Sequence, residues 1–477
     1  MKKLRFPESL VLIFLMIVLA QVAAYLLPPG LYERVEAPGT HREMVVPGTF
    51  HELTPEQLPA DHFSRSPGDF ARSLPTFLLA IPKGLEEGGE IIFFVFIVGG
   101  VIGVIRATGA IDALIGLAIH HLGSRPAVLV AGMTTLFAIG SSTIGMAEEY
   151  MPFIPILVTM CLALELDAMV AMGIVYIGAG VGYGAAALNP FTVMIGQRIA
   201  GLPLTSGQTF RWILLLVCLV VGVHHIMRYV HRLKRDRNSS LLRDVDYSEG
   251  FEMPQDLALT KRRLAILIVL LTGIGIFVYG VRTKDQGGWD WYFPELNAIF
   301  LGMALLSAVI GRVTPNETAR RFCMGAAEMT TTALLIGFAR TIQVVLDDAQ
   351  VIDTVIHGIA GPLANLGPTM AAVGMYGVQC VCNFFVPSGS GQAYVTMPIM
   401  APLADLVGIT PQTSVLAYQM GDGFTNMVVP TNALLMGMLG LGRIPYQRWM
   451  RFVGPLMVKL FIVGSIALAV AVRIEYA

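Results

Sequence analysis

The sequence predicts an all-α polytopic membrane protein with two repeats of inverted topology, each containing a re-entrant hairpin and a discontinuous helix. Three observations favour this fold class. The 477 residues are 55% hydrophobic and only 14% charged, whereas soluble domains carry about 25% charged residues. Apolar runs long enough to cross a bilayer recur along the chain. The runs are also interrupted at corresponding positions in its two halves.

The duplication is visible as groups of residues that recur in the same order. At an offset of 241 positions, Gly84, Glu87 and Asp112 match Gly325, Glu328 and Asp353. At an offset of 246, Ser142, Gly145 and Pro152 match Ser388, Gly391 and Pro398. At an offset of 243, Gly178, Gly180 and Asn189 match Gly421, Gly423 and Asn432. Chance alignment of apolar sequence is the alternative, but the shared order favours duplication. A doubled apolar unit with matching interruptions is typical of secondary transporters.

Apolar runs mark the expected spans. They lie at 9–27, 91–107, 126–140, 168–187, 212–230, 264–281, 294–311, 331–346, 369–386, 413–420 continuing past 424, and 453–472. The first run follows Lys2, Lys3 and Arg5, as in a signal peptide. However, it is as long as a bilayer crossing needs, and no small-residue cleavage site follows it. We therefore interpret it as a retained first span.

Loop charges predict the orientation of the chain. Loop 28–75 carries seven acidic residues and four arginines, whereas loop 231–263 is rich in lysine and arginine. The positive-inside rule then places the amino terminus and loop 231–263 in the cytoplasm. The expected division is a first span and external loop at 1–83, repeat A at 84–231, a basic cytoplasmic linker with connecting spans at 232–324, and repeat B at 325–477.

Two kinds of interruption are candidates for binding. Hydroxyl-rich breaks at 140–149 and 387–393 are expected to be hairpin tips, with an ordinary extramembrane turn as the alternative. Irregular backbone at membrane depth must be buried in protein or line a cavity. Helix N-termini there can bind a carboxylate. Backbone carbonyl oxygens without a helical partner, and the hydroxyl oxygens of serine and threonine, can bind sodium. Glycine-rich stretches at 178–184 and 421–426 are expected to unwind, with close helix packing as the alternative.

We expect charged residues inside apolar runs to have a functional role, because a charge in lipid is energetically costly. Asp422 lies within the second glycine-rich stretch, and Arg198 and Arg340 are the candidate cationic partners. An intramembrane ion pair is the alternative role for these charges. Asp112 and Asp353 are expected to cap interfacial helices. The predicted substrate- or ion-binding residues are Ser141, Ser142, Thr143, Glu148, Glu149, Asn189, Thr192, Ser388, Ser390, Asp422, Thr425, Asn426, Thr431 and Asn432.

Other function classes are remote. The sequence contains no HExxH motif and no Gly-x-Ser-x-Gly with a partner histidine, so we predict no catalytic residues. The five cysteines show no CxxC spacing, so neither a disulfide nor a structural metal is expected. We predict no cofactor beyond a coupling sodium ion or proton at the same breaks, and a net charge of −1 gives no indication of nucleic acid. A channel and a membrane-embedded enzyme remain as distant alternatives.

The motifs at these breaks resemble the C4-dicarboxylate anaerobic carrier-like family, in its YfcC-type branch of the ion-transporter superfamily. They are GMAEE at 145–149, NPFT at 189–192, GLPLTSG at 201–207 followed by Phe210-Arg211, and GDGFTN at 421–426. The resemblance runs from the first span to the end. It implies two inverted repeats, a homodimer, elevator-like motion and ligands from the hairpin tips and unwound segments. It also implies a prokaryotic cytoplasmic (inner) membrane protein.

The expected function is secondary active transport of a small carboxylate-bearing solute across the lipid bilayer, by ion-coupled uptake or by antiport. The predicted site contains three acids, Glu148, Glu149 and Asp422, against two arginines. This balance favours a basic amino acid, whose ammonium group an acid can bind. The alternative is a C4-dicarboxylate, whose two carboxylates would each need a cationic or dipolar group of the protein.

Overall fold

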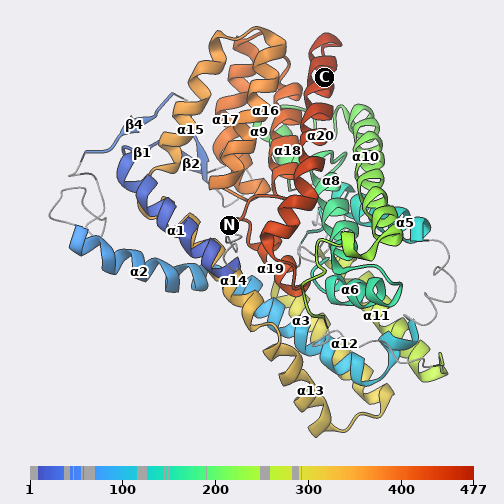
Figure 1. Ribbon diagram of the computed structural model, residues 1–477. Helices are drawn as coiled ribbons and strands as arrows, with labels where there is room; N and C mark the ends of the chain where they lie inside the picture. Colours follow the sequence, from blue (N-terminus) through green and yellow to red (C-terminus); the bar gives the residue numbers. More distant parts are fainter. Residues whose placement is uncertain are drawn as a thin grey trace.

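The computed structural model describes residues 9–36, 43–46, 48–54, 57, 70–114, 126–143, 145–147, 150–189, 191–247, 258–281, 289, 291 and 293–477. The described part of the chain is mainly helical (Figure 1). Its first half forms α1 (Ser9–Leu26), α2 (Phe70–Glu87), α3 (Gly89–Ala107), α5 (Pro126–Thr143), α6 (Phe153–Ala163), α7 (Ala168–Met172), the π-helical η3 (Gly173–Ile177), α8 (Gly178–Gly184), α9 (Val193–Ile199) and α10 (Gln208–Arg235).

The second half continues the helical pattern. It forms η4 (Arg237–Ser239), α11 (Lys261–Val281), α12 (Phe293–Gly311), α13 (Pro315–Ala327), α14 (Thr330–Asp348), α15 (Ile352–Ala360), η6 (Gly361–Asn365), α16 (Pro368–Phe385), α17 (Gly389–Leu406), α18 (Pro411–Thr425), α19 (Ala433–Leu441) and α20 (Tyr446–Arg473). Every apolar run predicted to be a span overlaps one of these helices.

Several helices are long and apolar enough to cross a membrane. Among the described residues these are α3, α5, α10, α12 and α20, and α13 with α14 would add a sixth as a span bent by 43°. Three shorter apolar helical stretches accompany them. The chain is therefore a multi-pass helical membrane protein.

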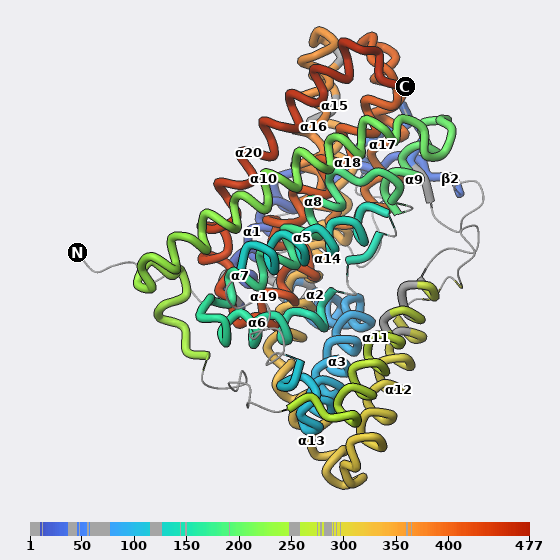
Figure 2. The backbone as a smooth tube through the Cα atoms, turned by 90° about the vertical axis from the view of Figure 1, so that its right-hand side faces the viewer, coloured from blue at the N-terminus to red at the C-terminus, as the bar shows by residue number. Residues whose placement is uncertain are grey.

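The helices form two packed groups. In one, α3 packs against α12 and α13, and α14 packs against α1 and α2. In the other, α5 packs against α8, α16 and α17 pack against α18, and α8 crosses α18. Figures 1 and 2 show α3 and α11–α13 at the lower end of the molecule, away from α16–α18. Helix α19 follows α18 in the chain, packs mainly against α14 and also contacts α6, so it lies between the two groups.

The glycine-rich stretches are helical, which corrects the expectation that they unwind. Residues 178–184 form α8, and residues 421–423 lie inside α18. Their glycines instead let helices approach closely, since a methyl group at Gly423 would lie 2.3 Å from the backbone nitrogen of Gly184. The helical backbone stops just afterwards, and α9 and α19 begin only at Val193 and Ala433. We call residues 185–192 break A and residues 426–432 break B.

Short strands between α1 and α2 depart from the expected all-α architecture. Strand β1 (Gly30–Leu31) pairs with β4 (His51–Glu52), and β2 (Arg34–Glu36) pairs with β3 (Glu43–Val45), both antiparallel. The strand segment lies outside the predicted apolar runs.

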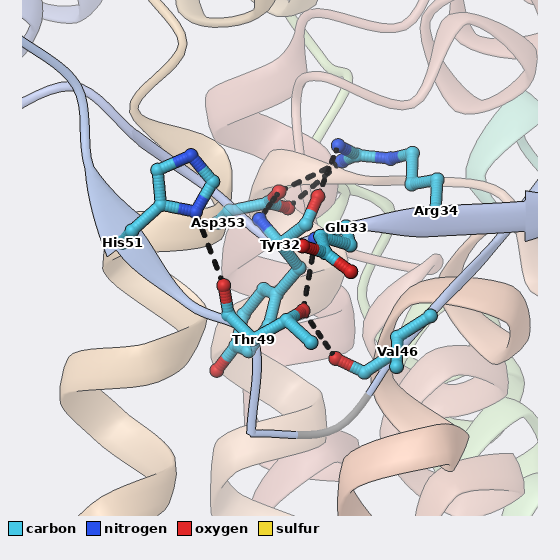
Figure 3. A network of polar contacts seen from close by, with 7 residues as sticks. All are labelled: Tyr32, Glu33, Arg34, Val46, Thr49, His51 and Asp353. Carbon is cyan, nitrogen blue, oxygen red and sulfur yellow. Dashed lines mark hydrogen bonds and ion pairs between the residues drawn. The ribbon is translucent and has the colours of Figure 1, made fainter.

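The strand segment is bound to the start of α15 (Figure 3). The Asp353 carboxylate accepts hydrogen bonds from the Tyr32 backbone nitrogen at 2.9 Å and from Arg34 Nη2 at 2.9 and 3.0 Å. The ring of Phe50 stacks on His357 at 4.1 Å between centroids. Asp353, expected to cap a helix, thus binds this segment from within the first turn of α15.

Part of the predicted basic linker folds back onto the bundle. The hydroxyl groups of Tyr229 and Ser240 donate hydrogen bonds to Asp167 Oδ2 at 2.5 and 2.7 Å. Arg448 Nη1 donates to the Leu241 carbonyl at 2.7 Å. Burial raises the pKa of the Asp167 carboxyl above its usual range, although these hydrogen bonds oppose the shift.

The Asp167 carboxyl predicts a pH dependence of stability. Because its pKa is raised in the folded state, its contribution to the free energy of unfolding is present at low pH and falls as the pH rises through that pKa. We expect the melting temperature of wild type, relative to Asp167→Asn, to fall from pH 4 towards pH 8 in detergent. A difference that does not change with pH would contradict the prediction.

The contact between α3 and α13 predicts a glycine requirement. A methyl group at Gly325 would lie 2.2 Å from the Gly99 carbonyl oxygen, so Gly325→Ala must separate the two backbones. We expect a loss of about 1–3 kcal/mol in the free energy of unfolding, read as a lower melting temperature. Gly302→Ala, where nothing lies within 4 Å of the added methyl, is the control and should be neutral or slightly stabilising. Equal melting temperatures would refute the packing argument.

Candidate functional site

Break A is folded onto the end of α5 by a short set of hydrogen bonds. The Ala187 and Leu188 backbone nitrogens donate to the Ser142 hydroxyl and carbonyl oxygens at 2.9 and 3.0 Å. Asn189 Nδ2 donates to the Ser141 carbonyl oxygen at 2.9 Å. Asn189 Oδ1 accepts from the backbone nitrogens of Phe191 and Thr192 at 2.8 and 3.2 Å. The side chain of Asn189 therefore replaces the helical hydrogen bonds that this stretch lacks.

The hydroxyl groups predicted at the first tip are used inside the protein. Ser141 Oγ donates to the Met146 carbonyl oxygen at 2.7 Å, and Thr143 Oγ1 donates to the Ile139 carbonyl at 2.7 Å. The Tyr183 hydroxyl donates to the Gly145 carbonyl oxygen at 2.9 Å. Glu148 and Glu149, predicted beside this tip, lie outside the described residues.

Break B is organised by asparagines. Asn383 Nδ2, at the end of α16, donates to the Asp422 carbonyl oxygen at 3.1 Å and to Thr425 Oγ1 at 2.8 Å. Asn426 Nδ2 donates to Asp422 Oδ1 at 3.2 Å, while Asn426 Oδ1 accepts from Asn432 Nδ2 at 2.6 Å. The structure thus brings together four of the predicted residues, Asp422, Thr425, Asn426 and Asn432.

The remaining predicted residues of repeat B have local roles. Ser388 Oγ caps α17 by accepting from the Gly391 backbone nitrogen at 3.3 Å. Thr431 Oγ1 donates to the Phe384 carbonyl oxygen at 2.8 Å. Ser390 is half-buried in the first turn of α17.

The two breaks meet at the start of α17. A methyl group built on Gly389 would lie 2.7 Å from Thr192 Cγ2 and 3.2 Å from Asp422 Oδ2. Both side chains are fully buried. Within the described parts of the chain, Thr192 Oγ1 and Asp422 Oδ2 have no hydrogen-bond partner. Buried polar atoms without partners are costly, so each of these two oxygen atoms is a candidate ligand for a cation, and the carboxylate oxygen is also a candidate site for a proton.

Sequence reasoning missed a neighbouring amide cluster between α16 and α17. Gln392 Nε2 donates to Gln379 Oε1 at 2.6 Å, and Thr396 Oγ1 donates to the same oxygen at 3.1 Å. Gln379 Nε2 and Gln392 Oε1 have no partner among the described residues. Asn383 was also missed. These residues could have been found from the sequence, because amide side chains inside apolar runs are expected to have a functional role.

The predicted cationic partners lie away from the breaks. Arg340 Nε lies 3.9 Å from Glu87 Oε2, so α14 and α2 share an ion pair, which was the alternative role for this charge. Arg198 is exposed at the end of α9. In the described ranges, no group of three or more histidine, cysteine or acidic side chains could hold a metal ion.

Comparisons with known proteins cover nearly the whole chain. The family model of the C4-dicarboxylate anaerobic carriers matches residues 6–473. The putative basic amino acid antiporter YfcC of Escherichia coli is 32% identical over 98% of this chain and 97% of its own length. An uncharacterised protein of Haemophilus influenzae is 28% identical over 99% and 98% of the two chains.

A solved structure gives a weaker match. The YdaH transporter of Alcanivorax borkumensis is 16% identical, with a TM-score of 0.45, over 98% of this chain and 99% of its own. The family match and the identity to YfcC confirm the resemblance drawn from the motifs. The protein is a membrane transporter, not an enzyme, and the chain belongs to the C4-dicarboxylate anaerobic carrier family.

Proposed function

We propose that the protein is a secondary active transporter of a small carboxylate-bearing solute, with a basic amino acid as the favoured substrate. The observation that carries this proposal is the buried Asp422 carboxylate, whose free oxygen lies beside Thr192 and the start of α17. A buried acid at membrane depth that has no cationic partner among the described residues implies a bound cation, a bound proton or a cationic substrate group.

The arrangement of contacts supports a duplicated unit, which we interpret as two inverted repeats, A at 84–231 and B at 325–477, together with the helices that precede each repeat. The contact of α1 with α14 has a counterpart in α12 with α3, and α2 with α14 has a counterpart in α13 with α3. Likewise α5 with α8 corresponds to α16 with α18. Exchanging the halves exchanges these contacts. Inverted repeats supply two mirror-related states, as alternating access requires.

The hydroxyl-rich breaks at 140–149 and 387–393 serve in this proposal as the tips of two re-entrant hairpins. Each joins two apolar helices, α5 to α6 and α16 to α17. A homodimer in the prokaryotic inner membrane, with a cytoplasmic amino terminus and an elevator-like motion, completes the proposal by family resemblance. The contact between α14 and α19 is where the two helical groups would slide.

Coupling to sodium or a proton is assigned to Asp422 and Thr192. A carboxylate and a hydroxyl oxygen suit a hard cation, and a carboxylate alone can carry a proton. Coupled uptake and antiport both use such a site, since either requires the ion or solute to compensate the charge of Asp422.

The substrate class follows from charge and from one relative. The breaks present an acid, and the relative YfcC is named a putative basic amino acid antiporter. An ammonium group would be bound by Asp422. The family name supports the second candidate, a C4-dicarboxylate, for which Asp422 would bind only the coupling ion.

The role of Asp422 predicts the behaviour of Asp422→Asn. The substitution removes the charge with little change of shape, so folding and membrane insertion should persist. We expect solute uptake in liposomes to fall at least about tenfold, as loss of a charged interaction implies. Asp405→Asn, at an exposed carboxylate on α17, is the matched control and should transport normally. Near-normal uptake by Asp422→Asn would return this acid to a structural role.

Substrate class predicts an order of competition. Arginine, ornithine and lysine should block labelled lysine uptake by liposomes better than succinate or fumarate, because only the former carry a cationic group for Asp422. Saturable uptake with counterflow would accompany this order in a carrier and not in a channel. The reverse order, measured against labelled succinate, would favour the dicarboxylate function.

A further inference from the structure

Arg211 is a fully buried arginine that has no counter-charge within the described part of the chain. It lies one turn inside α10, which begins at Gln208. Its Nε donates to the Tyr476 hydroxyl oxygen at 3.1 Å, and its Nη1 donates to Gln419 Oε1. Its Nη2 has no partner, and it makes no ion pair, among the residues that the structure describes. A buried guanidinium with only neutral partners is costly unless an anion joins it.

The two partners of Arg211 are themselves held in place. The Tyr476 hydroxyl donates to the Gly207 carbonyl oxygen at 2.7 Å. Gln419 Nε2 donates to the Ala186 carbonyl oxygen at 2.7 Å, which turns its Oε1 towards Arg211. The guanidinium is therefore oriented by a side chain that is bound to break A.

Gln419 also relates Arg211 to Asp422. Gln419 and Asp422 are three positions apart on α18. Their Cα atoms are therefore separated by about 4.5 Å along the helix axis, and their side chains are neighbours on the helix surface. A positive and a negative group, each buried and incompletely bonded, thus lie near break A, Arg211 through Gln419 and Ala186 and Asp422 beside Thr192. One solute with both charges would compensate them together.

A structural role explains these observations less well. Arg211 joins α10 to the carboxyl-terminal residues through Tyr476, and a neutral hydrogen-bond donor could do the same without a buried charge. The planar fork of arginine is suited to bind a carboxylate through two parallel hydrogen bonds. The predicted tips offer hydroxyl groups at Ser141–Thr143 and Ser388–Ser390 as other candidates for a carboxylate. Those of Ser141, Ser142, Thr143 and Ser388 already have protein partners.

We propose that Arg211 recognises the carboxylate of the transported solute, while Asp422 binds its cationic group. This inference rests on the proposed transport function and deepens it, because it assigns the carboxylate to a residue outside the predicted hairpin tips. A zwitterionic or cationic amino acid satisfies both residues. An amine that lacks the carboxylate satisfies only Asp422.

The test uses pairs of ligands that differ in the carboxylate. Thermal unfolding of the purified full chain in detergent is measured against arginine and agmatine, lysine and cadaverine, and succinate and succinamide. For wild type we expect the carboxylate member of the amino-acid pairs to bind roughly ten- to a hundredfold more tightly. In Arg211→Gln this ratio should fall to within about threefold, as a lost charged hydrogen bond implies, because only the carboxylate member weakens.

Two further variants separate recognition from folding. Arg228→Gln removes an exposed charge from the same helix and should keep the wild-type ratio. Arg211→Lys keeps the charge without the planar fork and should lower the ratio in part. If Arg211→Gln does not fold, the ratio measured for Arg211→Lys tests the inference.

The outcomes are distinct. Three results would overturn the inference. The ratio of affinities could be unchanged in the Arg211 variants, or the variants could lose affinity equally for both members of each pair. Wild type could also show no preference for the carboxylate member in any pair. An Arg211-dependent preference confined to succinate over succinamide would retain the role of Arg211. It would instead overturn the proposal that the solute is an amino acid.

Discussion

The site depends on asparagine side chains that replace missing backbone hydrogen bonds. Water is scarce at membrane depth, so a chain that leaves the helix must find protein partners for its N–H and C=O groups. Asn189 supplies them in break A by joining the end of α5 to the backbone of Phe191 and Thr192. Asn383 and Asn432 do so around break B. Uncharged amides achieve this without the desolvation cost of an ion.

Close helix packing brings the two breaks together. Gly184 and Gly423 let α8 and α18 touch through their backbones, and each helix ends within a few residues of that crossing. Gly389 similarly lets the start of α17 approach Thr192 and Asp422. Side chains at these positions would separate the breaks, so the absence of three Cβ atoms determines the geometry of the candidate site.

Charge is distributed unequally between the two helical groups. In the group that contains α2 and α14, charged side chains pair with one another, as Arg340 does with Glu87 and Lys83 with Asp348. Around the breaks, Asp422 and Arg211 are buried, and their partners among the described residues are neutral. Paired charges hold helices together, whereas incompletely compensated charges favour a ligand. This contrast is the physical basis for placing transport at the breaks.

Much of the helical framework follows from the sequence, because a span needs a long apolar run whatever its neighbours are. The predicted runs overlap helices throughout, and the motifs identified the family. The positions of Asn189, Thr192 and Asp422 near interruptions were also predictable, since polar groups are rare in such runs. The roles of Glu148 and Glu149 and the inverted repeats remain predictions.

Tertiary structure decided how those polar groups are used, because that depends on which helix lies opposite. The glycine-rich stretches are helical since partner helices pack against them, and no local pattern distinguishes this use from unwinding. Ser141 and Ser142 bond to their own tip and to break A. Arg211 belonged to a motif of the family resemblance near a span end, but no binding role was predicted for it from the sequence. Only the fold shows it buried against Gln419, because burial is a property of the neighbours that long-range packing supplies.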